Sequence, residues 1–282
     1  MESKISRRKL LQTGIGAVLL GPPAYALGVE PKWLALERLQ IPIEGLPPGF
    51  EGTKVAVISD VHYPKNISKG FVDRACGLAM SESPDLVVLP GDFVDGHDRS
   101  KRVPNMRGLY DRLRAPLGVW GSVGNHDVAM GERQVLREIE RNTPIQMLAN
   151  EHVILRRGGD SLCLAAVGDL WYGVVDLERS LSGVPPELPR LLLSHNPDLA
   201  EDLAPGRYRI DLQISGHTHS GEVLVPGLSF TPSKYGDKFR QGLAAGLSHR
   251  VYVTRGIGSP RFARFMARPE VSLLTLVRSP RP

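Results

Sequence analysis

The sequence predicts an α/β fold in four layers (α/β/β/α), with two β-sheets packed face to face and helices on the outside. In the first half of the chain, short apolar runs typical of strands alternate with segments of helical character. In the second half, strand-like runs follow one another with fewer helices between them. No linker-like stretch separates the two halves, so we expect a single domain to contain both sheets.

The expected elements follow this order closely. Residues 27–53 are interpreted as a connector with a candidate first strand around Leu39–Ile43, and residues 54–282 as the main domain. The first half then predicts strands at 55–58, 85–89 and 119–123 and helices at 71–80, 106–113 and 131–142. The second half predicts strands at 153–155, 162–167, 191–194, 212–215, 251–254 and 271–277.

The composition is that of a globular protein. Hydrophobic residues make up 41% and charged residues 23% of the 282 residues, so a sizeable core can be buried. The 30 glycines and 23 prolines favour many turns, as in enzymes whose ligands lie on loops. The two cysteines, Cys76 and Cys163, are predicted to be buried thiols, since neither has metal-ligand spacing.

The N-terminus is interpreted separately from the fold. Two arginines, Arg7 and Arg8, precede an apolar run at residues 13–21, and Ala24-Tyr25-Ala26 has the spacing of a cleavage site. Residues 1–26 resemble a twin-arginine (Tat) signal peptide, with Leu10 where phenylalanine is frequent. The resemblance implies export by the Tat machinery to the periplasm or cell envelope. The alternative is a basic tail before a membrane-anchoring helix, although the apolar run is shorter than the roughly 20 residues of a span.

The net charge gives little reason to expect nucleic-acid binding. Residues 1–26 contain four basic side chains and one acidic one, a net +3 of the chain's +5. The remaining +2 is modest for the rest of the protein, so no nucleic acid is expected as a partner.

Five strand-like runs end abruptly in polar residues, and these define the candidate site. The blocks that follow the runs are Asp60-Val61-His62, Gly91-Asp92-Phe93-Val94-Asp95, Gly124-Asn125-His126-Asp127, His195-Asn196-Pro197 and Gly216-His217-Thr218-His219. The carboxyl ends of strands in a layered α/β fold are where a ligand crevice forms. Aspartate oxygens and imidazole nitrogens suit Mn, Fe or Zn, and the number of ligands suffices for two metal ions that share a carboxylate.

These five blocks, in this order, resemble the calcineurin-like metallophosphoesterases, from about residue 54 to 277. The segments at 168–171, 194–198 and 254–258 resemble the bacterial, Tat-exported YaeI/YkuE-type phosphodiesterase branch of that family. The resemblance implies that Asp60, His62 and His219 hold one divalent metal ion, that Asn125, His195 and His217 hold the other, and that Asp92 bridges them. His126 would then be the catalytic residue, as a general acid or an electrostatic stabiliser.

Other polar residues keep two interpretations. Asp95 and Asp127 either orient the metal ligands or serve only as turn residues. His97, His152 and His249 match no block and are predicted to lie at the surface. The segment 255–268 could present Arg255, Arg261, Arg264 and Arg268 to phosphate, with Phe262, Phe265 and Met266 offering a surface for lipid, or could simply dock on the core.

The function predicted from the resemblance is hydrolysis of phosphodiester or pyrophosphate bonds at the cell envelope, by a water molecule that two metal ions activate. One alternative is a pyrophosphatase of UDP-linked lipid precursors at a membrane surface, with a nucleotide-lipid substrate and peripheral membrane contact. The other is a non-catalytic, metal-binding envelope protein. His126 favours an enzyme, because a binding module has no need of a proton donor beside its metal ligands.

Overall fold

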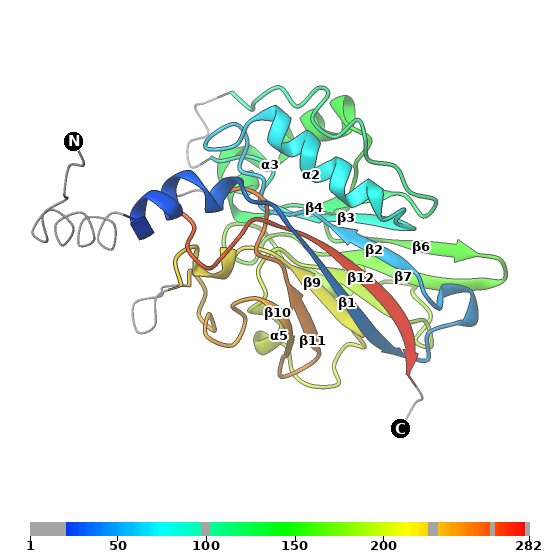
Figure 1. Ribbon diagram of the computed structural model, residues 1–282. Coiled ribbons are helices and arrows are strands. Elements are labelled where there is room, and N and C mark those ends of the chain that lie inside the picture. The colour runs from blue at the N-terminus through cyan, green and yellow to red at the C-terminus, as the bar shows by residue number, and fades with distance from the viewer. Residues whose placement is uncertain (1–20, 97–101, 225–230, 260–262, 280–282) are drawn as a thin grey trace, which may run out of the picture.

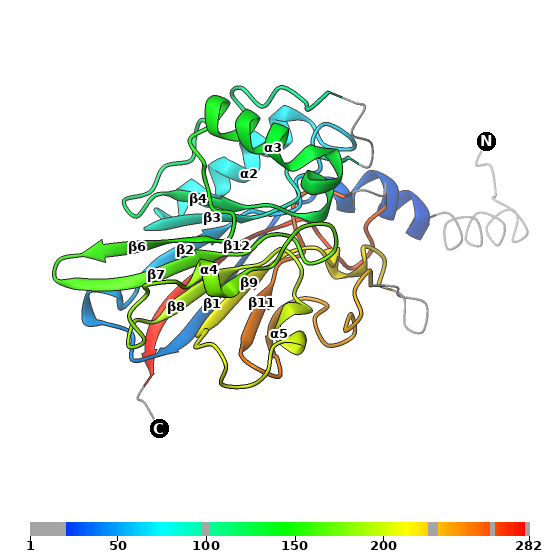
Figure 2. The same cartoon turned by 180° about the vertical axis from the view of Figure 1, so that it is seen from behind.

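The computed structural model of the protein describes residues 21–96, 102–224, 231–259 and 263–279, and its centre is a pair of six-stranded sheets (Figures 1 and 2). The first sheet has the order β1-β12-β2-β3-β4-β5, with strands Ala35–Glu44, Glu270–Ser279, Lys54–Val57, Leu86–Pro90, Val119–Ser122 and Gln146–Met147. The second has the order β10-β11-β9-β8-β7-β6, with strands Gly242–Ala245, Arg250–Val253, Leu212–Ser215, Arg190–Leu193, Asp160–Ala166 and Glu151–Arg157.

Helices cover the outer faces and confirm the predicted α/β architecture with two sheets. Helices α2 (Lys69–Ser81) and α3 (Asn125–Asn142) lie on the first sheet (Figure 1). The short helices α4 (Leu177–Ser180) and α5 (Leu199–Asp202) pack on the second sheet through Leu177 and Leu199. Three short 3₁₀ turns are present in the described residues, at Glu30–Lys32, Pro48–Phe50 and His219–Gly221.

The central strands are apolar on both faces because each face is covered. In β2, Val55 and Val57 pack between the sheets, whereas Ala56 joins the core beneath α2 and α3. β3 alternates in the same way, with Leu86 and Val88 facing the second sheet. Side chains on a strand alternate between faces, so two covered faces require an uninterrupted apolar run.

The first strand is longer than the sequence predicted, and its partner lies at the other end of the chain. β1 pairs in parallel with β12 along ten residues, from Ala35 with Glu270 to Glu44 with Ser279. β12 also pairs with β2, but antiparallel, with Ser272 opposite Val57. The start of β12, and with it the start of β1, therefore lies at the edge of the sheet where β2 ends.

Two helix predictions need correction. Residues 106–113 form turns rather than a helix, because Gly108 adopts a φ of 74°, which interrupts a right-handed helix. Helix α3 begins at Asn125, six residues before the predicted start at 131. It contains a non-helical residue, Gly131 with φ 123°, which divides it into two helical stretches.

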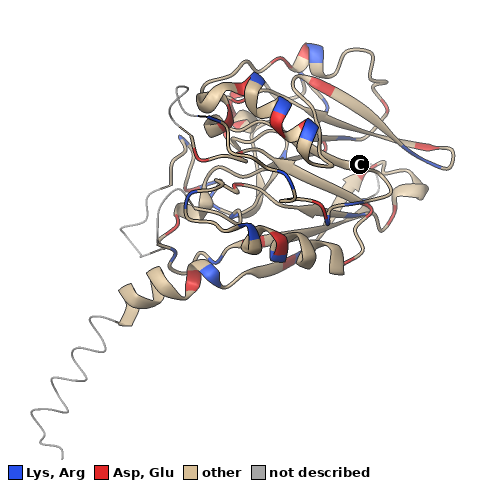
Figure 3. Ribbon diagram, turned by 90° about the horizontal axis from the view of Figure 1, so that it is seen from above, with Lys and Arg blue, Asp and Glu red and all other residues tan. Residues whose placement is uncertain are grey.

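The N-terminal region extends from the body as a helix over residues 21–28, in which no residue is charged (Figure 3). Among the described helices, none combines the length and apolar character that crossing a bilayer requires. Most of the predicted signal peptide lies outside the described residues. Both cysteines are buried and free, as predicted.

Candidate metal centre

The loops after five strands bring all eight predicted site residues to one place. Asp60 and His62 follow β2, Asp92 follows β3, and Asn125 and His126 begin α3 directly after β4. From the second sheet, His195 follows β8, and His217 and His219 follow β9. All eight side chains are buried although they are polar, which requires that they satisfy one another or bind a ligand.

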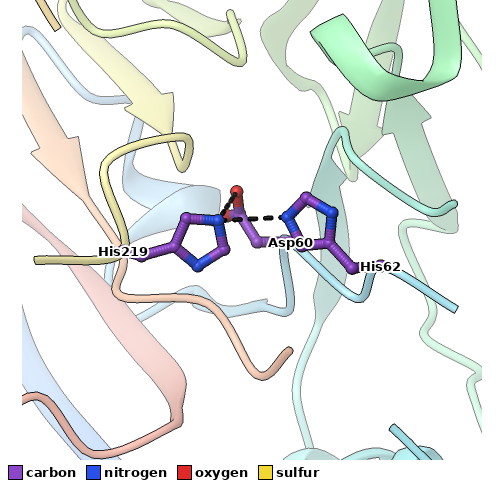
Figure 4. A group of neighbouring side chains, drawn as sticks. All are labelled: Asp60, His62 and His219. Carbon is purple, nitrogen blue, oxygen red and sulfur yellow. Dashed lines mark hydrogen bonds and ion pairs between the residues drawn. The ribbon is translucent and has the colours of Figure 1, made fainter. Parts of the chain in front are cut away.

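Asp60, His62 and His219 form the first group of potential ligands (Figure 4). The Nε2 atoms of His62 and His219 lie 3.0 Å apart. Asp60 Oδ1 lies 3.4 Å from His219 Nε2. Each residue thus directs one donor atom to a common point, although the residues come from both sheets.

Asp92 connects this group to a second one. Its Oδ2 lies 3.6 Å from His62 Nε2 and 3.1 Å from His195 Nε2. On the far side, His217 Nδ1 lies 2.9 Å from Asn125 Oδ1, and the His195 and His217 rings are edge to face at 5.2 Å. One carboxylate oxygen therefore lies between two groups of imidazoles.

The backbone of the site has unusual φ values, and one close contact in it requires a glycine. Asp60, His62 and Asp92 have φ values of 54°, 50° and 55°, a region that non-glycine residues seldom occupy and that is often found at functional sites. A Cβ atom on Gly216 would lie 2.0 Å from Asp60 Oδ2. The glycine before His217 therefore permits the second sheet to approach the Asp60 carboxylate.

The donor set fits divalent metal ions. Asp60 Oδ2 and His217 Nε2 are buried, and neither has a hydrogen-bond partner among the described residues. Buried polar atoms of this kind are rare in a folded protein unless a ligand completes them. Carboxylate oxygen, amide oxygen and imidazole nitrogen are the ligands that Mn, Fe and Zn accept, so the residues present fit such ions.

Most of the histidines are held in the neutral form that binds metal. Burial lowers the pKa of His62 to about 3 and that of His217 to about 3. Burial also lowers the pKa of His219 well below its ordinary value. Neutral imidazole is the form that donates a lone pair to a metal ion.

His195 and Asp92 behave differently because they form an ion pair. Burial opposes the charge on His195, but the charge of Asp92 outweighs it and raises the pKa of His195 to about 10. In turn, burial disfavours ionised Asp92, yet His195 holds the pKa of Asp92 well below its usual range. Burial raises the pKa of Asp60 to about 6. His195 must release its proton before it can serve as a metal ligand.

His126 lies beside these groups, and a carboxylate outside the ligand set holds it. Its Nδ1 is 3.3 Å from Asp95 Oδ1, and Asp95 is also paired with Lys65 at 3.0 Å. Burial disfavours protonated His126, but Asp95 outweighs burial and raises the pKa of His126. Despite its own burial, those partners lower the pKa of Asp95 to about 2.

Asp127 is a fixed buried carboxylate that positions the loops. Its Oδ2 accepts hydrogen bonds from the backbone N–H groups of Asp92 (2.8 Å) and Gly124 (2.9 Å). Its Oδ1 accepts from those of Phe93 (3.0 Å) and Val94 (3.2 Å). Of the two interpretations of Asp127, this geometry favours orientation of the loops that carry the ligands.

The site opens into a pocket of about 240 Å³ whose other walls the sequence did not predict. Trp171, Glu222 and Pro232 line it together with the ligands. The Trp171 ring meets the His217 ring edge to face at 4.3 Å. Trp171 belongs to a segment that its family resemblance had singled out and starts a loop expected to influence substrate choice, whereas Glu222 and Pro232 carried no signal.

The arginine-rich segment 255–268 is largely engaged with protein. Arg255 pairs with Glu37 and Glu270 at 2.6 and 2.7 Å. Arg264 is buried and donates to carbonyl oxygens of its own loop, while its Nη2 lies 3.4 Å from His219 Nδ1. The described part of the segment therefore favours docking on the core. Arg261 and Phe262 lie outside the described residues.

One histidine prediction is wrong. His249 is buried, with Nε2 2.8 Å from Gln213 Oε1 and Nδ1 2.7 Å from Ser248 Oγ. Gln213 also donates to Ser215 Oγ, so the ring belongs to a polar network on the second sheet. His152 is partly buried, and His97 lies outside the described residues.

The amino-acid sequence of the chain is similar to those of known proteins. Residues 53–221 match the family model of the calcineurin-like phosphoesterases. The chain is 31% identical to the uncharacterized metallophosphoesterase YkuE of Bacillus subtilis (strain 168), over 97% of this chain and 98% of that protein. It is 30% identical to the phosphodiesterase YaeI of Escherichia coli (strain K12), over 97% and 100%. It is 26% identical to the UDP-2,3-diacylglucosamine pyrophosphatase LpxG of Chlamydia trachomatis serovar D, over 91% and 93%.

Proposed function

Because the chain belongs to the calcineurin-like phosphoesterase family, and is therefore a hydrolase of phosphate esters, we propose that it cleaves phosphodiester or pyrophosphate bonds with two bound metal ions. The observation that carries the proposal is the position of Asp92, whose Oδ2 lies between the Nε2 atoms of His62 and His195. A single carboxylate so placed can serve two metal ions.

The ligands divide into two sets around that carboxylate. Asp60, His62 and His219 would hold one ion, with Asn125, His195 and His217 holding the other. When bound, two such ions bind phosphate oxygens and lower the pKa of a water molecule toward neutrality. Mn, Fe and Zn all suit these donors.

The remaining chemistry belongs to His126. Asp95 raises the pKa of His126 against the opposing effect of burial and so favours its protonated form, whose proton can be given to the oxygen of the leaving group. His126 also lines the pocket, where its charge would stabilise a phosphate that gains negative charge during the reaction. The alternative function is that of a non-catalytic, metal-binding protein. Such a protein has no need, beside its metal ligands, of a histidine whose protonated form a carboxylate favours.

Two substrate classes remain in view. The relative YaeI is named as a phosphodiesterase and LpxG as a pyrophosphatase of a nucleotide-linked diacylglucosamine. The apolar walls Trp171 and Pro232 favour a substrate with an apolar or aromatic group beside its phosphate. A lipid-linked nucleotide is therefore the second candidate.

The place of action is proposed to be the cell envelope, reached through the Tat machinery. The support is the pair Arg7 and Arg8 before an apolar run. Fractionation of cells that express the full chain, beside an Arg7→Lys/Arg8→Lys variant, tests it. Retention of the variant in the cytoplasm is expected, and equal export of both chains would contradict the proposal.

Hydrolysis of model esters tests the reaction. We expect metal-stripped protein reloaded with Mn²⁺ to cleave bis-p-nitrophenyl phosphate faster than p-nitrophenyl phosphate. Asp92→Asn should lower kcat/KM by roughly 10³-fold and reduce bound metal. His126→Ala should lower kcat by about 10²-fold or more while metal content stays unchanged.

His152→Ala is the matched control, since His152 is a partly buried histidine outside the site. Unchanged activity of Asp92→Asn would overturn the two-metal mechanism. Metal binding without ester cleavage under any loading would favour the non-catalytic alternative.

A further inference from the structure

Four large apolar side chains are exposed near the N-terminal end of the described chain. Leu27, Val29, Trp33 and Met266 are 56%, 51%, 52% and 66% exposed, and we refer to them as the apolar patch. Single exposed hydrophobic residues are ordinary, but a group of them marks a surface that contacts something.

Contacts between two chain segments hold this group together. The backbone N–H of Arg264 donates to Ala26 O at 2.9 Å. The backbone N–H of Ala267 donates to Glu30 Oε1 at 2.6 Å, and Arg268 Nε donates to Trp33 O at 3.0 Å. Residues 26–33 and 264–268 therefore lie side by side, which places Met266 and the three N-terminal residues in the same region of the molecule.

Met266 combines an exposed side chain with an unusual backbone conformation. Its φ is 57°, a value that favours glycine and is unusual for a long side chain. The residues around it are fixed, since Arg264 and Ala267 are both buried. The chain therefore keeps an apolar side chain in solvent on a backbone conformation that L-residues seldom adopt, which is a frequent mark of a functional site.

The apolar patch lies next to the metal pocket. Trp33 and Met266 come shortly before β1 and β12, and both strands begin at the edge of the first sheet where β2 ends and Asp60 follows. The link is also direct, because Phe265 N donates to the backbone oxygen of Glu222, a residue that lines the pocket.

Positive charge surrounds the apolar side chains. Leu27, Lys32 and Arg74 line one hollow of about 380 Å³, and the Arg268 guanidinium lies 4.1 Å from the centre of the Trp33 ring. Glu30, the acidic residue in this stretch, is buried and bonded to Ala267 N. Tryptophan with flanking lysine and arginine is the composition found where proteins meet the headgroups of a membrane.

We propose that the apolar patch contacts the surface of an anionic lipid bilayer and so brings the metal pocket to the headgroups. Leu27 lies near the end of the helix over residues 21–28, which extends the chain toward its N-terminus. The uncharged run Leu10–Leu20 lies just upstream of this helix in the sequence. This inference rests on the proposed function. It names the substrate class as amphiphilic phosphodiesters or pyrophosphates, which would be cleaved at the polar end while the acyl chains remain in the bilayer.

Tryptophan fluorescence of the full-length, metal-loaded protein tests the contact directly. Vesicles of phosphatidylglycerol are expected to shift the Trp33 emission to shorter wavelength, and brominated lipids should quench it. Trp33→Phe should remove most of that response, whereas Trp171→Phe should leave it. The upstream run can bind a vesicle by itself, but it cannot produce a signal that depends on Trp33.

Co-sedimentation with the same vesicles measures the strength of the contact. Leu27→Ser/Met266→Ser should lower the partition coefficient roughly tenfold, and high salt or phosphatidylcholine vesicles should weaken binding further. Leu247→Ser, at an equally exposed leucine on the second sheet side, is the matched control. Hydrolysis of a small soluble diester should be unchanged in Leu27→Ser/Met266→Ser and in Leu247→Ser.

Three results would overturn the proposal. The first is a Trp33 emission that vesicles leave unchanged, and the second is vesicle binding that the patch substitutions do not weaken. The third is dimerisation of the soluble protein that Leu27→Ser/Met266→Ser abolishes, which would assign the patch to a second copy of the chain. A lack of ester hydrolysis would end the proposed function and the substrate class but leave the vesicle measurements valid.

Discussion

The two sheets use the same device, a buried carboxylate that accepts backbone N–H groups, to hold different parts of the site. On the first sheet, Asp127 holds residues 92–94 and Gly124, the backbone that carries Asp92 and Asn125. On the second sheet, Asp169 accepts from Trp171 and Tyr172 N–H groups, and Asp198 accepts from the Lys234 and Tyr235 N–H groups.

The difference lies in what each carboxylate positions. Asp127 fixes the backbone of two proposed metal ligands, whereas Asp169 and Asp198 fix segments that contain no proposed ligand but form or adjoin the pocket wall, including Trp171. The contacts of Asp127 therefore bear on the geometry of the proposed ligands Asp92 and Asn125, and the contacts of Asp169 and Asp198 bear on what fits beside them. Substitutions in the two regions should accordingly separate metal affinity from substrate preference.

The largest expected effect is that of Asp127→Asn compared with Asp198→Asn. Each oxygen of Asp127 accepts two N–H groups, so in either orientation an asparagine NH₂ faces two donors. We expect metal affinity to fall 10–100-fold and the free energy of unfolding by about 2–3 kcal/mol. Metal titration and chemical denaturation measure the two quantities.

Asp198→Asn should have a smaller effect, because its NH₂ can face the single N–H of Lys234 while its oxygen keeps Tyr235 and Ser233. Metal affinity should stay within about threefold of the parent, since no ligand lies on the loop it holds. Equal loss of metal in both variants would remove the distinction between the two regions.

Trp171→Ala should affect substrate preference alone. The Trp171 side chain is 45% exposed and forms a wall of the pocket against His217. We expect kcat/KM for a bulky diester to fall about tenfold with metal content unchanged, because lost contact area costs on the order of 1–2 kcal/mol. Tyr172→Ala, on the same turn but outside this pocket, is the control, and an equal loss there would assign the effect to the turn.

Asp95→Asn should shift the pH profile of kcat. Asp95 raises the pKa of His126, so removing its charge lowers that pKa. If protonated His126 is the general acid, activity is lost when pH rises through its pKa, and the alkaline limb should move to lower pH in the variant. An unchanged limb would show that another group sets it.

The smallest effect is expected from His249 and concerns stability only. Burial lowers its pKa to about 4, below the ordinary 6.5. The unfolded chain therefore takes up a proton first as pH falls, and stability decreases between about pH 6.5 and 4. At pH 5 we expect a loss of about 1–2 kcal/mol relative to pH 7 that His249→Gln does not share. The prediction is wrong if the free energy of unfolding changes by the same amount between pH 7 and pH 5 in the parent protein and in His249→Gln.

The gathering of the candidate site residues at one place could be predicted from the sequence because their signal is local. Asp60, Asp92 and His217 each stand two or three residues after an apolar run, and strand ends of one sheet meet at one edge. The walls of the site could not be predicted in the same way. Glu222 reaches the pocket through a loop conformation with φ 59°, and no pattern in the sequence specifies such a turn.

Long-range packing explains the remaining differences. His249 resembles any surface histidine in sequence, and only its position against Gln213 on a neighbouring strand buries it. The full length of β1 depends on β12, which lies more than two hundred residues later in the sequence. The helix expected at 106–113 has suitable residues but includes Gly108, whose conformation the fold uses for a turn.

The position of β12 has a consequence for synthesis on the ribosome. It lies between β1 and β2, yet it is translated after every other strand of both sheets. Until Glu270–Ser279 have emerged, β2 exposes an unpaired edge and β1 has no partner in its sheet. A nascent chain should therefore remain aggregation-prone and depend on chaperones until β12 has emerged, and stop codons just before residue 270 should yield insoluble rather than partly active protein.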